Sequence, residues 1–182
     1  KTTPQQISST PYAGAGYCHQ VWLTEDQHYM LMDDEFDESD FGLNTTTLIW
    51  DVSNLDAPVL IGDFTHNTTS IDHNQYVKGN YVYQSNYSSG LRIFDLTNVA
   101  NASLTEVAYF DVYPQSDIKD FEGTWDNYPY LPSGHVLVSG MFGGGTAGLF
   151  ILQPNITADF KVASQDEVLN ACSVGSTSTT ID

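Results

Sequence analysis

Short apolar segments separated by turn residues recur along the chain in a fixed order. Those that begin at His28, Asn80 and His135, "HYMLMDD", "NYVYQSN" and "HVLVSGM", each follow a turn and carry apolar residues in alternation. After a variable insert come β-branched and aromatic segments: "TLIWDVSNL", "GLRIFDLTN" and "GLFILQP". Because the apolar runs are short and are broken by Gly, Pro, Asn and Asp, the pattern predicts β-strands and argues against helices.

These segments belong to a unit that repeats about every 50 residues. The three units open with "HQVW" (19–22), "HNQY" (73–76) and "EGTW" (122–125), and "PVLIGDF" (58–64) matches "LTEVAYF" (104–110) as a fourth strand. Four antiparallel strands at a period of ~40 to 50 residues are typical of a β-propeller blade. A β-sandwich also alternates short strands, but it does not explain why the units resemble one another. The sequence therefore predicts an all-β, propeller-like array of four-stranded blades.

The predicted blades lie within residues 1–154 and cover about 19–72, 73–121 and 122–154. Residues 4–10, "PQQISST", match the fourth-strand segments, so we expect them to form the outer strand of a preceding blade. The tail, 155–182, becomes rich in Ser and Thr and predicts a linker or the start of a further β module. Since closed propellers need at least ~4 blades, we expect this chain to be part of a longer one, or to be completed by partner subunits.

The charge of the chain is strongly acidic, with 23 Asp and Glu against five Lys and Arg and a net charge of −18 at pH 7. Such a surface repels phosphate backbones and anionic lipid, so nucleic acid and membrane surfaces are not expected as partners. No run approaches the ~20 apolar residues that a membrane helix needs, so we expect no direct membrane insertion in this segment. Divalent cations and cationic partners are the expected counter-species.

Two features favour an extracellular or cell-surface location. Asn-x-Ser/Thr triplets, the acceptors of N-glycosylation, occur at Asn44, Asn67, Asn86, Asn101 and Asn155. An Asn-, Ser- and Thr-rich chain also produces such triplets by chance. The cysteine pair, Cys18 and Cys172, could form a disulfide between the start and the end of the chain in an oxidising compartment, and two buried thiols are the alternative.

Long stretches of the chain resemble the choice-of-anchor B family of secreted or surface-anchored proteins with LVIVD-type repeats. The stretches are "GYCHQVWLTEDQHYMLMDDEFDE", "LIWDVSNLDAPVLIG", "IDHNQYVKGNYVYQSNYSSGLRIFDL", "LTEVAYFDVYPQSD" and "FEGTWDNYPYLPSGHVLVSG" with "GLFILQP", and they run from about residue 4 to residue 154. The resemblance implies an extracellular propeller followed by a further β module and an anchoring segment. It supplies no reaction and no ligand, because fold does not give function.

One repeated position carries residues that could bind a transition metal. His19, His73 and Glu122 are equivalent in the three units, and two imidazoles with a carboxylate suit zinc. Asp72, beside His73, could orient an imidazole. The alternative is that these side chains form hydrogen bonds between blades. The repeated aromatic residues Trp22, Tyr76 and Trp125 favour packing between blades over a platform for sugars.

A second group of candidate ligands lies in the insert that follows the second strand of the first blade. It is an acidic run, Asp33, Asp34, Glu35, Asp37, Glu38 and Asp40. Clustered carboxylates suit calcium, although the run lacks the spacing of an EF-hand loop. A solvated acidic loop is the alternative.

The sequence contains no GxSxG, HExxH or paired CxxC motif, so the leading hypothesis is a non-catalytic one. It is a glycosylated extracellular propeller that serves as a scaffold or interaction protein. A component of a surface or matrix filament is its more specific form, and calcium is the expected cofactor. Open strand edges would bind protein partners or further copies of the chain. The alternatives are a metal-dependent hydrolase that uses His19, His73 and Glu122, and a glycan-binding module.

Overall fold

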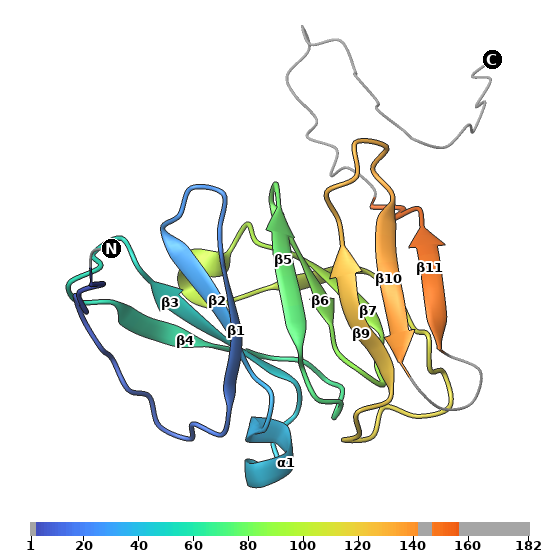
Figure 1. Ribbon diagram of the computed structural model, residues 1–182, viewed down its shortest axis with the longest axis horizontal. Helices are drawn as coiled ribbons and strands as arrows, with labels where there is room; N and C mark the ends of the chain where they lie inside the picture. The colour runs from blue at the N-terminus through green and yellow to red at the C-terminus, as the bar shows by residue number, and fades with distance from the viewer. Residues whose placement is uncertain (1–2, 142–146, 157–182) are drawn as a thin grey trace, which may run out of the picture.

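The computed structural model describes residues 3–141 and 147–156, and these form three antiparallel sheets that stand side by side (Figure 1). The first sheet contains β1 (Cys18–Leu23), β2 (Tyr29–Asp34), β3 (Thr46–Asp51) and β4 (Val59–Thr65), and the short helix α1 (Asp37–Phe41) joins β2 to β3. The second contains β5 (Asn74–Lys78), β6 (Tyr81–Ser85), β7 (Leu91–Asp95) and β8 (Thr105–Phe110), with the 3-10 turn η1 (Val99–Asn101) before β8. The third contains β9 (Gly123–Tyr128), β10 (Val136–Met141) and β11 (Gly148–Leu152).

Equivalent strands of the first two sheets share local details as well as order. A β-bulge interrupts the β3–β4 pairing between Ile49 and Trp50, and a second one interrupts β7–β8 at the matching place, between Ile93 and Phe94. Each following turn is closed by an aspartate that accepts a backbone N–H two residues on, Asp51 in the first sheet and Asp95 in the second. Bulges and turn residues set the twist and register of a sheet, so their repetition shows that the two sheets are copies of one unit.

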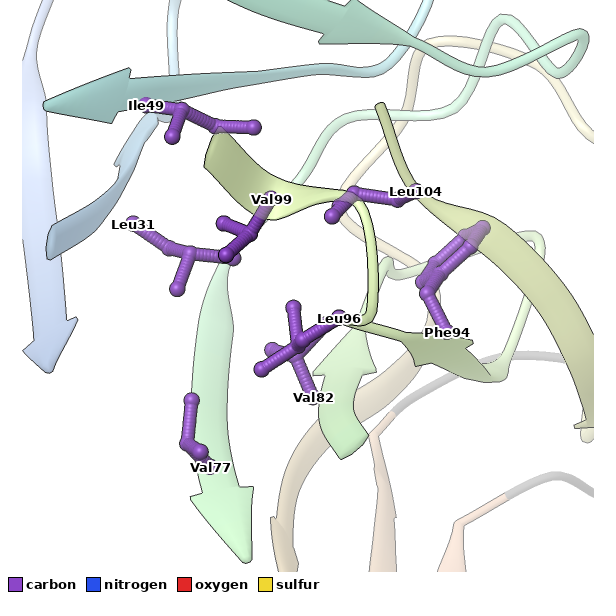
Figure 2. Packing of buried hydrophobic residues seen from close by; sticks show 8 residues of the cluster. All are labelled: Leu31, Ile49, Val77, Val82, Phe94, Leu96, Val99 and Leu104. Carbon is purple, nitrogen blue, oxygen red and sulfur yellow. The ribbon is translucent and has the colours of Figure 1, made fainter. Parts of the chain in front are cut away.

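The hydrophobic core lies between neighbouring sheets (Figure 2). Eight buried side chains form the larger cluster, between the first and second sheets: Leu31, Ile49, Val77, Val82, Phe94, Leu96, Val99 and Leu104. A second cluster joins the second and third sheets and includes Tyr83, Ile93 and Val138. Because each sheet buries its apolar side chains mainly against its neighbour, the sheets pack face to face as the blades of a propeller do.

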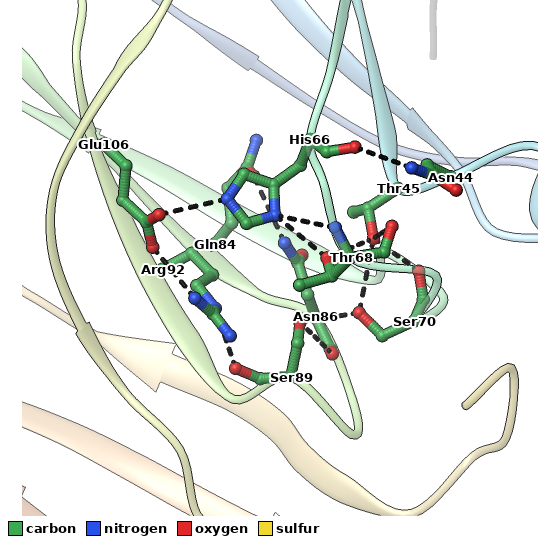
Figure 3. A network of polar contacts seen from close by, with 10 residues as sticks. All are labelled: Asn44, Thr45, His66, Thr68, Ser70, Gln84, Asn86, Ser89, Arg92 and Glu106. Carbon is green, nitrogen blue, oxygen red and sulfur yellow. Dashed lines mark hydrogen bonds and ion pairs between the residues drawn. The ribbon is translucent and has the colours of Figure 1, made fainter. Parts of the chain in front are cut away.

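Polar groups are also buried between the first two sheets. His66 lies between Thr68 and the Glu106 carboxylate, which is 3.1 Å from its Nε2 and is also bound by Arg92 at 3.0 Å (Figure 3). Between the second and third sheets, the Asn127 side chain donates to the carbonyl of Tyr83. The blades are therefore joined by specific hydrogen bonds in addition to apolar contact.

Some sequence-based expectations about the ends stay predictions. Residues 4–10 form no strand with the rest of the described chain, which leaves their expected role in a preceding blade untested. Most of the tail 155–182 lies outside the described residues. No helix in residues 3–141 and 147–156 is long and apolar enough to cross a membrane.

Gly123 is the position where the contact between the second and third blades leaves no room for a side chain. Its φ is 101°, and a Cβ there would lie 2.3 Å from the carbonyl oxygen of Tyr87, which accepts the N–H of Thr124. We expect Gly123→Ala to lower the free energy of unfolding by about 4 kcal/mol, since strain and collision combine. Gly79, at φ 60° in open space, is the matched control, and Gly79→Ala should cost only about 1 kcal/mol. Urea unfolding measures both, and equal losses would contradict the close approach.

Candidate metal centres

Both candidate ligand groups lie where the first and second blades meet. β1 pairs with β2 through Cys18 with Asp34 and Gln20 with Asp33, so His19 is the extra residue of a β-bulge. The inner strands β1 and β5 contact each other, which brings His19 onto His73, the residue just before β5. The two imidazole rings stack with centroids 4.4 Å apart and planes 24° from parallel.

The carboxylate that joins these two histidines is Glu35. Its Oε2 is 3.3 Å from Nδ1 of His19, and its Oε1 is 3.8 Å from Nε2 of His73. Tyr87 donates its hydroxyl to Oε1 at 2.5 Å, and burial, together with this bond, raises the pKa of the tyrosine. Burial lowers the pKa of His73. The ligand atoms of His19, Glu35 and His73 all lie within 4.8 Å of one another.

Glu122, the residue expected to complete this group, stands elsewhere. It precedes β9, and its carboxylate raises the pKa of the Tyr113 hydroxyl. It is not part of the group that the described residues form around His19 and His73. On the third blade, the backbone carbonyl of Trp125 approaches His73 instead, at 2.6 Å from Nδ1. Glu35, and not the predicted Glu122, is therefore the carboxylate of this group.

Apart from Asp40, the rest of the acidic run is buried, and a solvated loop does not describe it. Relative exposure is 1% for Asp33, 3% for Asp37 and 0% for Glu38, and Asp72 from the second blade is also 0% exposed. Glu38 accepts the backbone N–H of Asp72 at 3.4 Å, which places the two residues together. We call Asp33, Asp37, Glu38 and Asp72 the carboxylate cluster.

The carboxylate cluster lacks hydrogen-bond donors. Five of its buried oxygens have no donor within the described part of the chain: Asp33 Oδ2, Asp37 Oδ1, Glu38 Oε2, Asp72 Oδ1 and Asp72 Oδ2. Gln75 donates to the other Asp33 oxygen at 2.7 Å. The one arginine that forms an ion pair among the described residues, Arg92, pairs with Glu106. Burying ionised carboxylates without partners costs several kcal/mol each, so the cluster requires protons or a cation.

The pKa values of the carboxylate cluster are raised, because ionising a buried carboxyl is costly. Burial, and then the neighbouring Asp37 carboxylate, raises the pKa of Glu38 to about 9. Burial also raises the pKa of Asp37 to about 7 and the pKa values of Asp33 and Asp72 well above their ordinary range. For Asp72, the nearby carboxylates of Asp33 and Glu38 add to the effect of burial. Without a cation, the cluster therefore holds protons at neutral pH.

Asp34 and Asp40 belong to the acidic run but not to the carboxylate cluster. Asp34 is fully buried, but its carboxylate accepts hydrogen bonds from the Tyr12 hydroxyl and from the backbone N–H groups of Gly16 and Tyr17, so it fixes the segment that leads into β1. Asp40 lies exposed on α1, the helix that projects at the bottom of Figure 1. Neither has an unpartnered buried oxygen.

The predicted glycosylation sites differ in exposure. Asn67, Asn101 and Asn155 are exposed, and Asn44 is half-buried with its side chain donating to the carbonyl of His66 (Figure 3). Asn86 is 1% exposed and donates to Gln84, so the folded chain leaves no room for a glycan there.

The predicted disulfide stays a prediction. Cys18 is exposed at the start of β1, and its predicted disulfide partner, Cys172, lies outside the described residues.

The repeated aromatic residues pack between blades, as the sequence suggested. Trp22 and Tyr76 meet edge to face with ring centroids 5.0 Å apart, and the Trp125 ring centroid lies 4.5 Å from that of His73.

An open groove of about 550 Å³ lies beside these aromatic residues, and Trp22, Val77 and Tyr130 line it. This groove is the place where the glycan-binding alternative can be tested.

Comparison with known proteins adds information about the fold. No protein-family model and no curated protein matches the chain. A solved structure of a protein from Lactobacillus plantarum matches with a TM-score of 0.53 and 14% identity, over 75% of this chain and 40% of that one. A putative 6-phosphogluconolactonase from Bacteroides fragilis NCTC 9343 matches with a TM-score of 0.48 and 17% identity, over 77% and 38% of the two chains.

The chain has a β-propeller-like fold. The match to the Lactobacillus plantarum protein, together with the three sheets, confirms the all-β, propeller-like prediction. The chain spans only 40% of the length of that protein. At 14% identity the likeness concerns the fold alone, and the resemblance to the choice-of-anchor B family stays a prediction.

Proposed function

We propose that this chain is a cation-dependent propeller module of an extracellular scaffold or interaction protein. In this proposal, a divalent cation of the calcium class is held by the carboxylate cluster. The observation that carries it is the set of five buried carboxylate oxygens without a donor. Calcium takes six to eight oxygen ligands and prefers carboxylates, and four carboxylates can supply most of them.

A cation at this place would stabilise the arrangement of the first two blades. Asp33 is on β2 and both Asp37 and Glu38 are on α1, all in the first blade, whereas Asp72 leads into β5 of the second. One ion bound to all four would join segments that are otherwise connected by the chain and the core. Such a module would keep its shape in calcium-rich surroundings and loosen when calcium is removed.

The outer strands support a role in interaction. Val59 on β4, Tyr109 on β8, and Leu149 and Ile151 on β11 are more than half exposed. Exposed apolar side chains on edge strands promote pairing with another chain. A subunit of a surface or matrix filament is the specific form of this proposal, and the exposed acceptors Asn67 and Asn101 support an extracellular location.

A second candidate function is metal-dependent hydrolysis, which the convergence of His19, Glu35 and His73 favours. A metal with an open position would lower the pKa of a bound water. Zinc-dependent cleavage of an activated ester, lost in His19→Ala, would favour this candidate.

The proposal is tested by the intact mass of the native protein, before and after treatment with a glycosidase and with a chelator. We expect excess mass that the glycosidase removes, with peptides showing modification at Asn67, Asn101 or Asn155 and none at Asn86. We also expect an added mass equal to bound calcium in native electrospray mass spectrometry, and we expect the chelator to remove it. A mass equal to that of the unmodified chain under all conditions would contradict both parts.

A further inference from the structure

We propose that His19, Glu35 and His73 form a second metal site, which takes a transition metal of the zinc class. The hydrolysis candidate would use this same site, but the site is proposed here for the metal that it binds, whether or not a reaction follows. It goes beyond the proposed calcium function because its ligands are chemically different. Imidazole nitrogens with one carboxylate suit zinc, whereas an all-carboxylate cluster suits hard cations such as calcium. The chain would therefore hold two kinds of metal at the same junction of blades.

The three ligands are already close to the spacing that a tetrahedral metal requires. Ligand atoms that lie ~2.1 Å from a metal in tetrahedral geometry are roughly 3.4 Å from one another. The Glu35 oxygens are 3.3 Å from His19 Nδ1 and 3.8 Å from His73 Nε2, and no pair in the group exceeds 4.8 Å. Small side-chain movements suffice to close the site.

Outer hydrogen bonds leave the correct nitrogen of each ring free. His73 Nδ1 is 2.6 Å from the carbonyl oxygen of Trp125, which can only accept, so Nδ1 carries the proton and Nε2 is free. Asn74 donates its side-chain nitrogen to the same carbonyl, which turns its Oδ1 toward His19 Nε2 at 3.3 Å. His19 Nε2 therefore donates and Nδ1 is free. Both free nitrogens face Glu35, as in metal sites whose histidines are oriented by outer acceptors.

The carboxylate is positioned in the same way. Tyr87, which is 1% exposed, donates to Oε1 of Glu35 and holds the group between the two rings. A simple ion pair would use only one of the two rings, whereas both stacked rings present a nitrogen to Glu35, at 3.3 and 3.8 Å from its oxygens. A metal bound to two neutral imidazoles and the carboxylate uses all three groups.

The site has one side from which a metal and a further ligand can enter. The side chain of His19 is 24% exposed, whereas those of Glu35 and His73 are 9% and 3% exposed. Three protein ligands leave a fourth tetrahedral position on the exposed side, and water or a group from a partner would occupy it.

The test is a titration of chelator-treated protein with Co²⁺ in saturating calcium, followed by displacement with Zn²⁺. We expect one equivalent of Co²⁺ with the visible absorption of a four-coordinate nitrogen and oxygen site, displaced by Zn²⁺. His19→Ala and Glu35→Gln should weaken binding at least ~100-fold. His28→Ala is the matched control, because His28 is exposed and pairs only with Asp26, and it should bind as the wild type does.

A cooperative melting transition shows that each variant is folded, and the response of its melting temperature to calcium separates the two metal proposals. Wild-type protein that fails to bind Co²⁺ or Zn²⁺ at millimolar concentration, or His19→Ala that binds them unchanged, overturns the zinc-class site even when the calcium response is intact. Binding of Co²⁺ that survives in protein without a calcium response supports the zinc-class site while the proposed function fails.

Discussion

Calcium will raise the melting temperature of the wild-type chain by about 8 to 16 °C and will leave that of Asp72→Asn unchanged. The wild-type value follows from a stabilisation of about 4 kcal/mol when free calcium is about 1,000 times the Kd, at about 2 to 4 °C per kcal/mol for a chain of this size. Asp72 carries the effect because both of its oxygens are buried without a donor and it joins the second blade to the first.

The same substitution will act in the opposite direction when calcium is removed. An amide in place of Asp72 needs neither a counter-charge nor a proton when it is buried, so Asp72→Asn in chelator at pH 8 should melt higher than the wild type in chelator. Asp40→Asn removes an equal charge from the exposed face of α1 and serves as the control for net charge. Differential scanning calorimetry of the three proteins gives all values, and a calcium response that survives in Asp72→Asn would show that the ion is not bound there.

The calcium-free protein will lose stability as pH rises from about 5 to about 9. Glu38 has a pKa of about 9 and Asp37 of about 7 in the folded chain. In the unfolded chain both titrate near pH 4. A carboxyl with a raised pKa keeps its proton on folding, so its contribution is complete below the unfolded pKa and is lost as pH rises through this window.

Calcium will abolish this loss of stability, because the ion binds the deprotonated carboxylates. Urea unfolding in chelator at a series of pH values should show the free energy of unfolding falling by several kcal/mol, and a parallel series in calcium should show no such fall. A flat or rising curve in chelator would mean that the carboxylates find donors in solution. Glu38→Gln should remove much of the slope, since it abolishes the titration of the carboxyl whose pKa is about 9.

The fold could be predicted from the sequence because each blade carries its own copy of the strand and turn pattern. "TLIWDVSNL" and "GLRIFDLTN" align so closely that the bulges at Trp50 and Phe94 fall at the same place in both sheets. Strand alternation and turn residues are local signals, and a repeat presents them several times. The contacts that join the blades, such as the approach of Gly123 to Tyr87, involve residues far apart in sequence and left no local signal.

The residues of the site could be predicted from the sequence only in part. The repeat placed His19 and His73 at equivalent positions, and their rings do stack. It suggested Glu122 as the third member by the same reasoning, whereas Glu35 reaches the pair from the end of the neighbouring strand. The division of the acidic run between a histidine group and a buried cluster depends on which side of β2 and α1 each carboxylate faces.

Asp72 and Tyr87 show what sequence reasoning missed. Asp72 was considered only as a partner of its neighbour His73, yet it belongs with carboxylates some 35 residues earlier, as its 34-residue separation from Glu38 indicates. Tyr87 lies 52 residues from Glu35 and bonds to it. The one available signal was that the matching places before and within the third unit have no aspartate or tyrosine.

The measurement that tests the account most directly is a crystal structure of the protein grown in calcium, with anomalous scattering to locate the ion. We predict a peak between Asp33, Asp37, Glu38 and Asp72, at ~2.3 to 2.6 Å from their oxygens. Water molecules that donate hydrogen bonds to the five oxygens at that place, with no anomalous peak, would contradict the cation-dependent module.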